Sequence, residues 1–252
     1  MKIPFAPPSL CSSDFKYVEK ALKSKWLTSG AYNLKFEKFF SKITKNKFCL
    51  SLNSCTSALE IAIKILDLKK NSEILIPSFT WVSTANAVIN CGHKVSFCDV
   101  DINSRSITLE ILKKSVTKNT KAVIIVHYAG LVYDMDRISN FCKKKKIKII
   151  EDSAETIGGY CNSKHPGSWG LGCFSFFPTK NITTGEGGML TVQNIQQFNK
   201  AKALIAHGIS STTLERDKKK NTFHKEAILP GHNFRLSNIN AALGFSQIKK
   251  LK

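Results

Sequence analysis

The chain has 252 residues, of which 42% are hydrophobic and 10% aromatic, proportions typical of a globular protein with one large core. No apolar run approaches the roughly 20 residues that span a bilayer, which argues against a membrane protein. The net charge of +20 comes from lysines scattered over many segments, without a stripe of interleaved aromatic residues, so nucleic-acid binding is disfavoured and an anionic substrate would suit the same field.

The amino-terminal stretch, MKIPFAPPSLCSSDF, precedes the first predicted strand. It lacks the apolar core of a signal peptide, so we expect a cytoplasmic protein. Its prolines argue against a helix in this stretch.

Eight cysteines are spread along the chain. They form no C-x-x-C pair and no Cys/His spacing that is typical of a metal site. We therefore expect small buried thiols, with neither a metal site nor a disulfide framework.

Seven short apolar runs alternate with longer amphipathic segments. The predicted strands are residues 48–52, 73–77, 94–100, 121–127, 147–152, 173–177 and 188–192. The predicted helices between them are residues 55–68, 80–91, 108–116 and 134–146. Strands that are apolar on both faces, with helices between them, are typical of a mostly parallel sheet that helices cover on both sides. We therefore predict an α/β fold with a seven-stranded sheet, in which ligands bind at the carboxyl ends of the strands.

A polar turn follows the first predicted strand, in SLNSCTSALE. Thr56 and Ser57 stand at the start of the next helix, where free backbone N–H groups and the helix dipole favour a phosphate. Plain capping of the helix by Ser54 or Thr56 explains the same pattern, and both interpretations stay open.

Candidate ligand-binding residues follow other strands as well. In IIEDSAE, Asp152 ends a buried strand and Glu155 follows three residues later. Trp81 follows a strand in IPSFTWVST, as a core residue or as a platform for a stacked ring. His127 and His207 fall near the same predicted cleft, where we expect satisfied core or supporting histidines.

One lysine, Lys180, stands alone between a phenylalanine run and a glycine-rich turn, in CFSFFPTKNITTGEGGML. Desolvation beside apolar groups lowers the pKa of a lysine amine and lets it form a Schiff base with an aldehyde cofactor. Pyridoxal phosphate also needs a phosphate cradle, an aromatic face, an acid at its ring nitrogen and a partner for its phenolic oxygen. One candidate for each role is present, in this order: Thr56 with Ser57, Trp81, Asp152 and Glu155.

The carboxy-terminal part contains a polar segment and then a helix. Residues 210–226 are charged and predict a mobile surface loop. The helix in LSNINAALGFSQIKKLK has an apolar face, and we expect it to lack a packing partner and to lower solubility.

The order of NSCTSALE, PSFTWVSTANAV, VHYAG, IIEDSAE, GCFSFFPTKNITTGEGGML and GHNFRLSNINAALG resembles the DegT/DnrJ/EryC1/StrS family of fold-type-I, pyridoxal-phosphate-dependent sugar aminotransferases. PSFTWVST and VHYAG resemble its UDP-4-amino-4-deoxyarabinose-forming branch. The resemblance implies an N-terminal segment with a substrate-side loop (1–32), a cofactor-binding large domain (33–236) and the start of a helix (237–252) that leads to a small C-terminal domain, largely absent here.

The resemblance also implies roles for single residues. Lys180 would bind the cofactor covalently and move the proton during transfer, and Asp152 would pair with the ring nitrogen. Trp81 would stack on the ring, and Glu155 would lie near the phenolic oxygen. The phosphate would be held by Thr56, Ser57, Ser175 and, from a neighbouring subunit of a homodimer, Asn233.

The implied reaction is amino transfer from glutamate to a nucleotide-linked keto-sugar, for the synthesis of cell-surface polysaccharides or related amino sugars. A dehydratase branch of the family has histidine in place of the lysine, so Lys180 favours amino transfer. The alternatives are a truncated, cofactor-binding fragment with little activity and, less favoured, a regulatory or nucleic-acid-binding protein.

Overall fold

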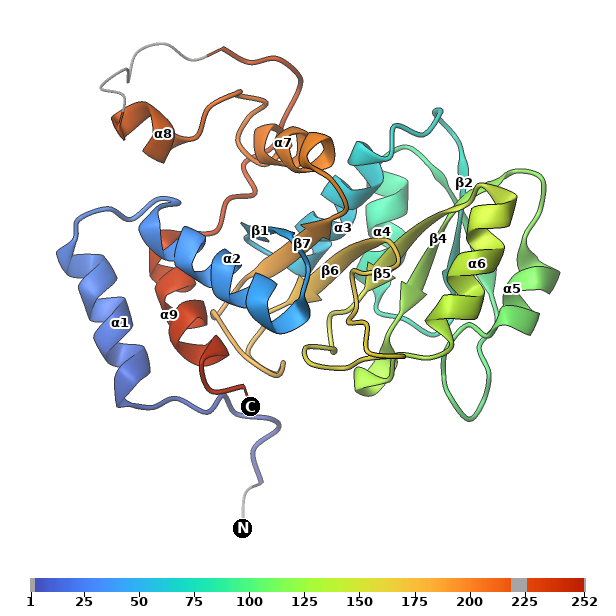
Figure 1. Cartoon of the computed structure of the whole chain (residues 1–252), viewed down its shortest axis with the longest axis horizontal. Coiled ribbons are helices and arrows are strands. Elements are labelled where there is room, and N and C mark those ends of the chain that lie inside the picture. The colour runs from blue at the N-terminus through green and yellow to red at the C-terminus, as the bar shows by residue number, and fades with distance from the viewer. Residues whose placement is uncertain (1–2, 219–225, 252) are drawn as a thin grey trace.

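The computed structural model describes residues 3–218 and 226–251, in which seven strands form one sheet with helices on both faces (Figure 1). The strands are β1 (Phe48–Leu52), β2 (Glu73–Pro77), β3 (Lys94–Cys98), β4 (Thr120–Val126), β5 (Lys148–Asp152), β6 (Leu171–Ser175) and β7 (Gly188–Val192). Their order across the sheet is β1-β7-β6-β5-β4-β2-β3. Only β7 runs antiparallel to its neighbours, so the prediction of a mostly parallel sheet of seven strands is confirmed.

The helices are α1 (Ser12–Lys23), α2 (Ala31–Thr44), α3 (Cys55–Ile65), α4 (Val82–Asn90), α5 (Leu109–Ser115), α6 (Met135–Lys145), α7 (Ile195–Leu204), α8 (Thr213–Lys218) and α9 (Asn238–Ile248). Helices α3, α4 and α7 cover one face of the sheet, and α2, α5 and α6 cover the other. Successive strand residues alternate between the two cores: Ile74 and Ile76 pack under α3, whereas Leu75 packs under α5 and α6. This double burial explains why the strands are apolar along their whole length.

Three helices besides the short α8 were absent from the sequence-based prediction. Helix α1 begins at Ser12, beyond the prolines, so the expected absence of a helix holds only for the residues before it. Helix α2 buries two phenylalanines that are one helical turn apart. Phe36 packs against Phe176, which follows β6, and Phe40 packs against Phe174 of β6. Helix α7 begins after β7, with Asn194 as its N-cap. Each was missed because its apolar stripe is short and is interrupted by lysines and polar residues.

The last helix does have a packing partner, contrary to our expectation. Helix α9 lies between α1 and α2 (Figure 1), with Ala242 and Ile248 buried. The Phe245 ring packs edge-on against Tyr17 of α1, with 5.3 Å between ring centroids. Gln247 Nε2 donates to the buried Asp14 Oδ2 at 2.9 Å. The helices that cover α9 precede it by some 200 positions in the sequence. Because every residue of α9 is buried or half-buried, the helix has no exposed apolar face that would lower solubility.

Two smaller expectations need correction. In the predicted loop 210–226, residues 213–218 form α8, and residues 219–225 lie outside the described part of the chain. None of the cysteines forms a disulfide, as predicted, but Cys11 is exposed and not buried. No helix in the described ranges combines the length and the apolar character that a membrane crossing requires.

Candidate active site

The predicted site residues come from strand ends that meet at one edge of the sheet. Asp152 ends β5 and Ser175 ends β6, and these two strands are parallel neighbours. Strand β1 runs in the same direction as β6, because both are antiparallel to β7, and α3 starts three residues after β1. Lys180 lies in the connection between β6 and β7. The connection from β6 to the antiparallel β7 therefore starts at the carboxyl ends of the central strands, and Lys180 lies in this connection.

Helix α3 offers a cradle for an anion at its first turn. Ser54 is the N-cap, and its Oγ accepts a hydrogen bond from the Ser57 backbone N–H at 3.0 Å, so the simple capping interpretation is confirmed for Ser54. The N–H groups of Cys55 and Thr56 have no acceptor within the helix, and they stay available for a ligand. Capping and anion binding are therefore compatible at this turn.

A glycine lets β7 approach this turn closely. A Cβ placed on Gly188 would lie 2.4–2.6 Å from backbone atoms of Ser54 and Cys55, which is too close for any side chain. The first residue of β7 must therefore be glycine if α3 is to start where it does.

The carboxylate of Asp152 is buried, with 5% of the residue exposed, and it accepts two hydrogen bonds. Thr84 Oγ1 of α4 donates to Oδ2 at 2.9 Å, and the Ala154 N–H donates to Oδ1 at 3.2 Å. Burial raises the pKa of Asp152, whereas the Thr84 and Ala154 hydrogen bonds and the positive charge of Lys180 act in the opposite direction.

Thr84 was missed by the sequence analysis. Its hydroxyl also contacts Thr80 Oγ1 at 2.7 Å, and because Thr84 gives its proton to Asp152, Thr80 donates to Thr84. The two threonines are four residues apart at the start of α4, next to Trp81. That spacing puts them on one side of the chain, but nothing in the sequence indicates that this side faces Asp152.

Lys180 is paired with Glu155. The Nζ atom lies 3.2 Å from Glu155 Oε1, and Glu155 Oε2 accepts a hydrogen bond from the Ala129 N–H at 2.9 Å. The lysine side chain is 21% exposed, so the amine is only partly shielded from water. We expected a desolvated amine, and this expectation is met only in part. The ion pair fixes the direction of the amine, and Ala129 fixes the carboxylate.

The other predicted residues lie around this pair to different extents. Ser175 is buried, and its Oγ accepts a hydrogen bond from the Phe177 N–H at 3.3 Å. Trp81 is the N-cap of α4 and is 77% exposed, so its ring is not part of the core. Asn233 is exposed and pairs by its backbone with Ala206. The next residue, Phe234, accepts the Asn53 N–H at 2.9 Å, which joins this segment to the turn before α3.

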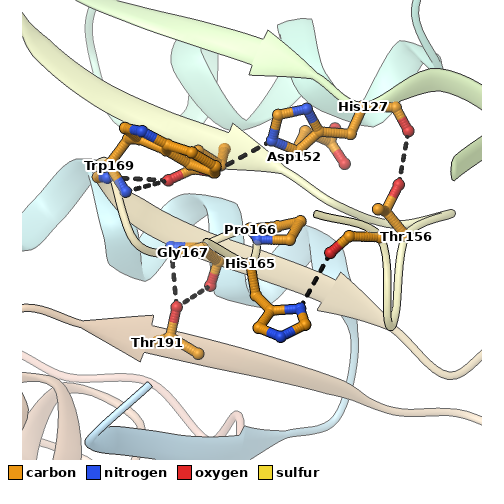
Figure 2. A network of polar contacts seen from close by, with 12 residues as sticks. His127, Asp152, Thr156, His165, Pro166, Gly167, Trp169 and Thr191 are labelled. Atoms are coloured by element: carbon orange, nitrogen blue, oxygen red, sulfur yellow. Dashed lines mark hydrogen bonds and ion pairs between the residues drawn. The ribbon is translucent and has the colours of Figure 1, made fainter. Parts of the chain in front are cut away.

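A buried network stabilises the loop after β5 (Figure 2). His127 Nε2 lies 3.1 Å from Glu151 Oε2, and Glu151 Oε1 accepts the Trp169 and Gly170 N–H groups at 3.0 and 2.8 Å. The His127 carbonyl accepts a hydrogen bond from Thr156 Oγ1 at 2.8 Å. His127 is thus a satisfied core histidine, as predicted, whereas His207 is exposed and the same interpretation is wrong for it. Because Glu151 and Asp152 are adjacent, the network also holds Asp152 in place.

These residues fit pyridoxal phosphate. The amine of Lys180 has a fixed partner, the buried Asp152 carboxylate is held by two donors, and the first turn of α3 has two free N–H groups. In contrast, the described residues contain no group of three or more His, Cys, Asp or Glu side chains that could hold a metal ion.

Comparisons with known proteins agree with this geometry. The family model described as the DegT/DnrJ/EryC1/StrS aminotransferase family matches residues 8–252. An uncharacterized protein of Methanocaldococcus jannaschii is 36% identical over 244 residues, which make up 96% of this chain and 63% of that protein. The chain thus spans less than two thirds of this curated relative's length.

Solved structures match over nearly the whole chain. The Helicobacter pylori aminotransferase PseC, involved in the biosynthesis of pseudoaminic acid, has a TM-score of 0.92 and 31% identity, over 99% of this chain and 66% of PseC. The Streptococcus pneumoniae protein Spr1654 in its PMP form has a TM-score of 0.90 and 26% identity, over 99% of this chain and 68% of Spr1654.

Proposed function

The chain belongs to the DegT/DnrJ/EryC1/StrS aminotransferase family, and we propose that it transfers an amino group from glutamate to a nucleotide-linked keto-sugar with pyridoxal phosphate as its cofactor. The proposal depends above all on one observation: Lys180 is paired with Glu155, three residues after the buried Asp152 at the end of β5, at the edge of the sheet where the first turn of α3 has free N–H groups. The donor and the sugar class come from the family resemblance.

Pyridoxal phosphate supplies an aldehyde that condenses with primary amines and a ring that draws electrons from the bonds next to them. Lys180 Nζ would hold this aldehyde, and it would accept and return the proton that moves in each half of the reaction. Glu155 Oε1 holds the amine in position.

Asp152 would keep a proton on the ring nitrogen of the cofactor. Its buried carboxylate would stabilise a positive charge there, because few water molecules compete for it and two donors favour its ionised form. The phosphate would be held by the N–H groups of Cys55 and Thr56 together with the hydroxyls of Thr56, Ser57 and Ser175. Trp81, exposed beside Thr84, would cover the ring.

Covalent attachment tests the role of Lys180. Reduction of the cofactor-loaded protein with borohydride is expected to leave a pyridoxyl group on the peptide that contains Lys180, found by mass spectrometry. Lys180→Ala should lose the label, and Lys200→Ala, which changes a lysine on the outer side of α7, should keep it. A label on other lysines at the same yield in Lys180→Ala would contradict the proposal.

Single half-reactions test the donor and the sugar. Glutamate alone should convert the bound cofactor to its amine form and release 2-oxoglutarate, and a nucleotide keto-sugar should then reverse the absorbance change. A chain that takes the label at Lys180 but converts neither substrate would support the alternative of a cofactor-binding fragment.

We also infer that two copies share their sites, with Asn233 of one subunit near the cofactor phosphate of the other. The exposed position of Asn233, which leaves it accessible to a second copy, supports this assignment. Asn233→Ala should weaken cofactor binding in a dimer. Light scattering that gives a monomer with full cofactor affinity would contradict it.

A further inference from the structure

Lysines that are scattered in the sequence gather at one edge of the sheet, opposite the candidate active site. Strands β2, β3, β4 and β5 are parallel, so their amino-terminal ends meet at this edge. The stretches that lead into them are residues 66–73, 90–94, 113–121 and 142–148. These stretches contain twelve exposed lysines, which we call the lysine edge: Lys69, Lys70, Lys94, Lys113, Lys114, Lys118, Lys121, Lys143, Lys144, Lys145, Lys146 and Lys148.

Few carboxylates offset this charge. Asp67 and Glu73 are the acidic residues of the same four stretches. Asp67 is paired with Lys200 of α7, and Glu73 Oε1 accepts hydrogen bonds from the hydroxyls of Thr117 and Thr120. Among the residues that the structure describes, no lysine of the edge forms an ion pair. The lysine edge therefore keeps an unneutralised positive charge.

The other edge of the same strands is rich in carboxylates. They are Asp99 and Asp101 after β3, Glu110 in the first turn of α5, and Asp134 and Asp136 at the start of α6. An even enrichment in lysine along the sequence would charge both edges alike, so composition alone does not explain this separation. A strand of five residues spans about 16 Å, more than the screening length of about 10 Å in 0.1 M salt. The carboxylates therefore offset little of the field at the lysine edge.

Part of the lysine edge has a local explanation. Helices α5 and α6 end at this edge, and the helix dipole stabilises cations at the carboxyl end of a helix. This effect accounts for the six lysines at positions 113, 114 and 143–146. The six others lie in connections or at the starts of strands, where no helix ends on them. The dipole therefore explains half of the cluster, and the rest calls for a partner outside the chain.

We propose that the lysine edge binds the surface of an anionic lipid bilayer. A lysine ammonium is a compact, strongly hydrated charge, which suits attraction to many anionic head groups at once. The four stretches contain no Arg, Trp, Tyr or Phe, the side chains that fork onto phosphates or stack on bases, so a nucleic acid fits this edge less well. No large apolar side chain of these stretches, all of which the structure describes, is exposed, so the attachment is electrostatic and without insertion.

Attachment by this edge leaves the Lys180 site open. That site lies at the carboxyl ends of the strands, and the lysine edge lies at their amino ends. An anionic surface attracts the lysines and repels the carboxylates of the other edge, so the molecule would lie on a bilayer in one orientation. The proposal does not depend on the reaction at Lys180.

Co-sedimentation of the cofactor-loaded protein with lipid vesicles tests the proposal. Vesicles of phosphatidylcholine that contain about one third phosphatidylglycerol should bind most of the protein at low salt, and about 0.5 M salt should release it. Vesicles of phosphatidylcholine alone should bind little. Equal binding to both kinds of vesicle, or no binding to either, would overturn the proposal.

Two combined variants connect the binding to the lysine edge. The first carries Lys143→Gln, Lys144→Gln, Lys145→Gln and Lys148→Gln, and the second carries Lys69→Gln, Lys70→Gln, Lys118→Gln and Lys121→Gln. Each should weaken the partition onto the anionic vesicles at least about 50-fold, because each lysine near an anionic surface adds to the binding free energy. Thermal unfolding verifies that each variant is folded.

A matched variant controls for net charge. It carries Lys16→Gln, Lys20→Gln, Lys25→Gln and Lys35→Gln, which change exposed lysines of α1, the turn after it and α2. It loses the same charge as each of the other two variants but should bind within about threefold of the unaltered protein, because these lysines lie away from the edge. Equal losses in all three variants would overturn the lysine edge as the binding surface.

Two further measurements separate the proposal from its rivals. A DNA duplex of about 20 base pairs, added at the same concentration of phosphate groups as the anionic lipid, should leave the protein on the vesicles. Release by the duplex would overturn the bilayer as the partner and favour a nucleic acid. The glutamate half-reaction in solution should be unchanged in all three variants, so its failure would concern the function proposed for the Lys180 site and not the lysine edge.

Discussion

The Lys180 site and the cavity of about 490 Å³ beside β1, which Arg216 and Arg235 line, both contain cations and carboxyl groups, but they pair them differently. Lys180 is 3.2 Å from Glu155, whereas Arg235 has no carboxylate partner in the described residues. A covalent site needs an amine that is held in one direction and can lose its proton. A binding site for an anion needs a permanent charge that nothing else has neutralised. The pairing of the cation therefore indicates which kind of chemistry each region is suited to.

The two regions also differ in their supports. Asp152 ends a central strand and is held by Thr84, Ala154 and the network around Glu151 (Figure 2). The cavity lies at the edge strand β1, and α8 closes one side of it. Rigid central strands suit a site where atoms must react, and we expect the cavity to adapt more to its ligand.

The largest expected effect concerns the Lys180 site. Asp152→Asn keeps the shape of the side chain but removes the charge that would hold a proton on the ring nitrogen. The glutamate half-reaction should slow by at least about 100-fold, comparable to the loss of one preorganised electrostatic partner. Stopped-flow absorbance measures this rate. The borohydride label at Lys180 should persist, and an unchanged rate would show that Asp152 is not the acid of the site.

The next effect tests the charge of the cavity. Burial raises the pKa of Glu37 from its ordinary value of 4.5 to about 7, so between these values the folded protein binds a proton that the unfolded chain does not. The stability that this carboxyl contributes is full below about pH 4.5 and is lost as the pH rises to about 7.

Glu37→Gln should remove that part of the pH dependence. Its amide oxygen can still accept the Ser51 hydrogen bonds, and it carries no charge at any pH. Urea unfolding at pH 5 and pH 8 should show a difference between the unaltered protein and the variant that changes by on the order of 2 kcal/mol. Parallel pH profiles of the two proteins would mean that Glu37 is ionised in the fold throughout.

A smaller effect is expected at the support of Asp152. Thr84→Val removes the hydroxyl that donates to Oδ2, which raises the pKa of Asp152 further and weakens its pairing with the ring nitrogen. Cofactor affinity should fall about tenfold. Thr84→Ser keeps the hydroxyl and should restore most of it. Equilibrium dialysis gives the affinities, and equal values for valine and serine would limit Thr84 to a packing role.

The smallest effect is expected away from both regions. Arg137→Gln breaks ion pairs with Glu110 and Asp134 that are exposed to solvent. Its effect on the free energy of unfolding should stay below about 1 kcal/mol, because solvent screens such pairs. A larger loss, measured by urea unfolding, would show that solvent does not screen these pairs.

The sequence alone predicted the seven strands, the mostly parallel sheet and the family. It also predicted the position of Asp152 at a strand end and of Lys180 in a glycine-rich connection, whereas it placed Ser175 inside a strand that in fact ends there. These features depend on local patterns, since the period of apolar residues and the turn residues act over a few positions. A lysine between a phenylalanine run and glycines is such a local pattern as well.

Only the tertiary structure decided the rest. Thr84 meets Asp152 across 68 positions, α9 packs on a helix more than 200 positions earlier, and Arg235 joins Arg216 at a cavity that neither local segment indicates. Such contacts follow from how whole elements are stacked, and many different side chains satisfy the same local pattern. The sequence therefore indicates which residues can react, and the packing determines which partners set their charge.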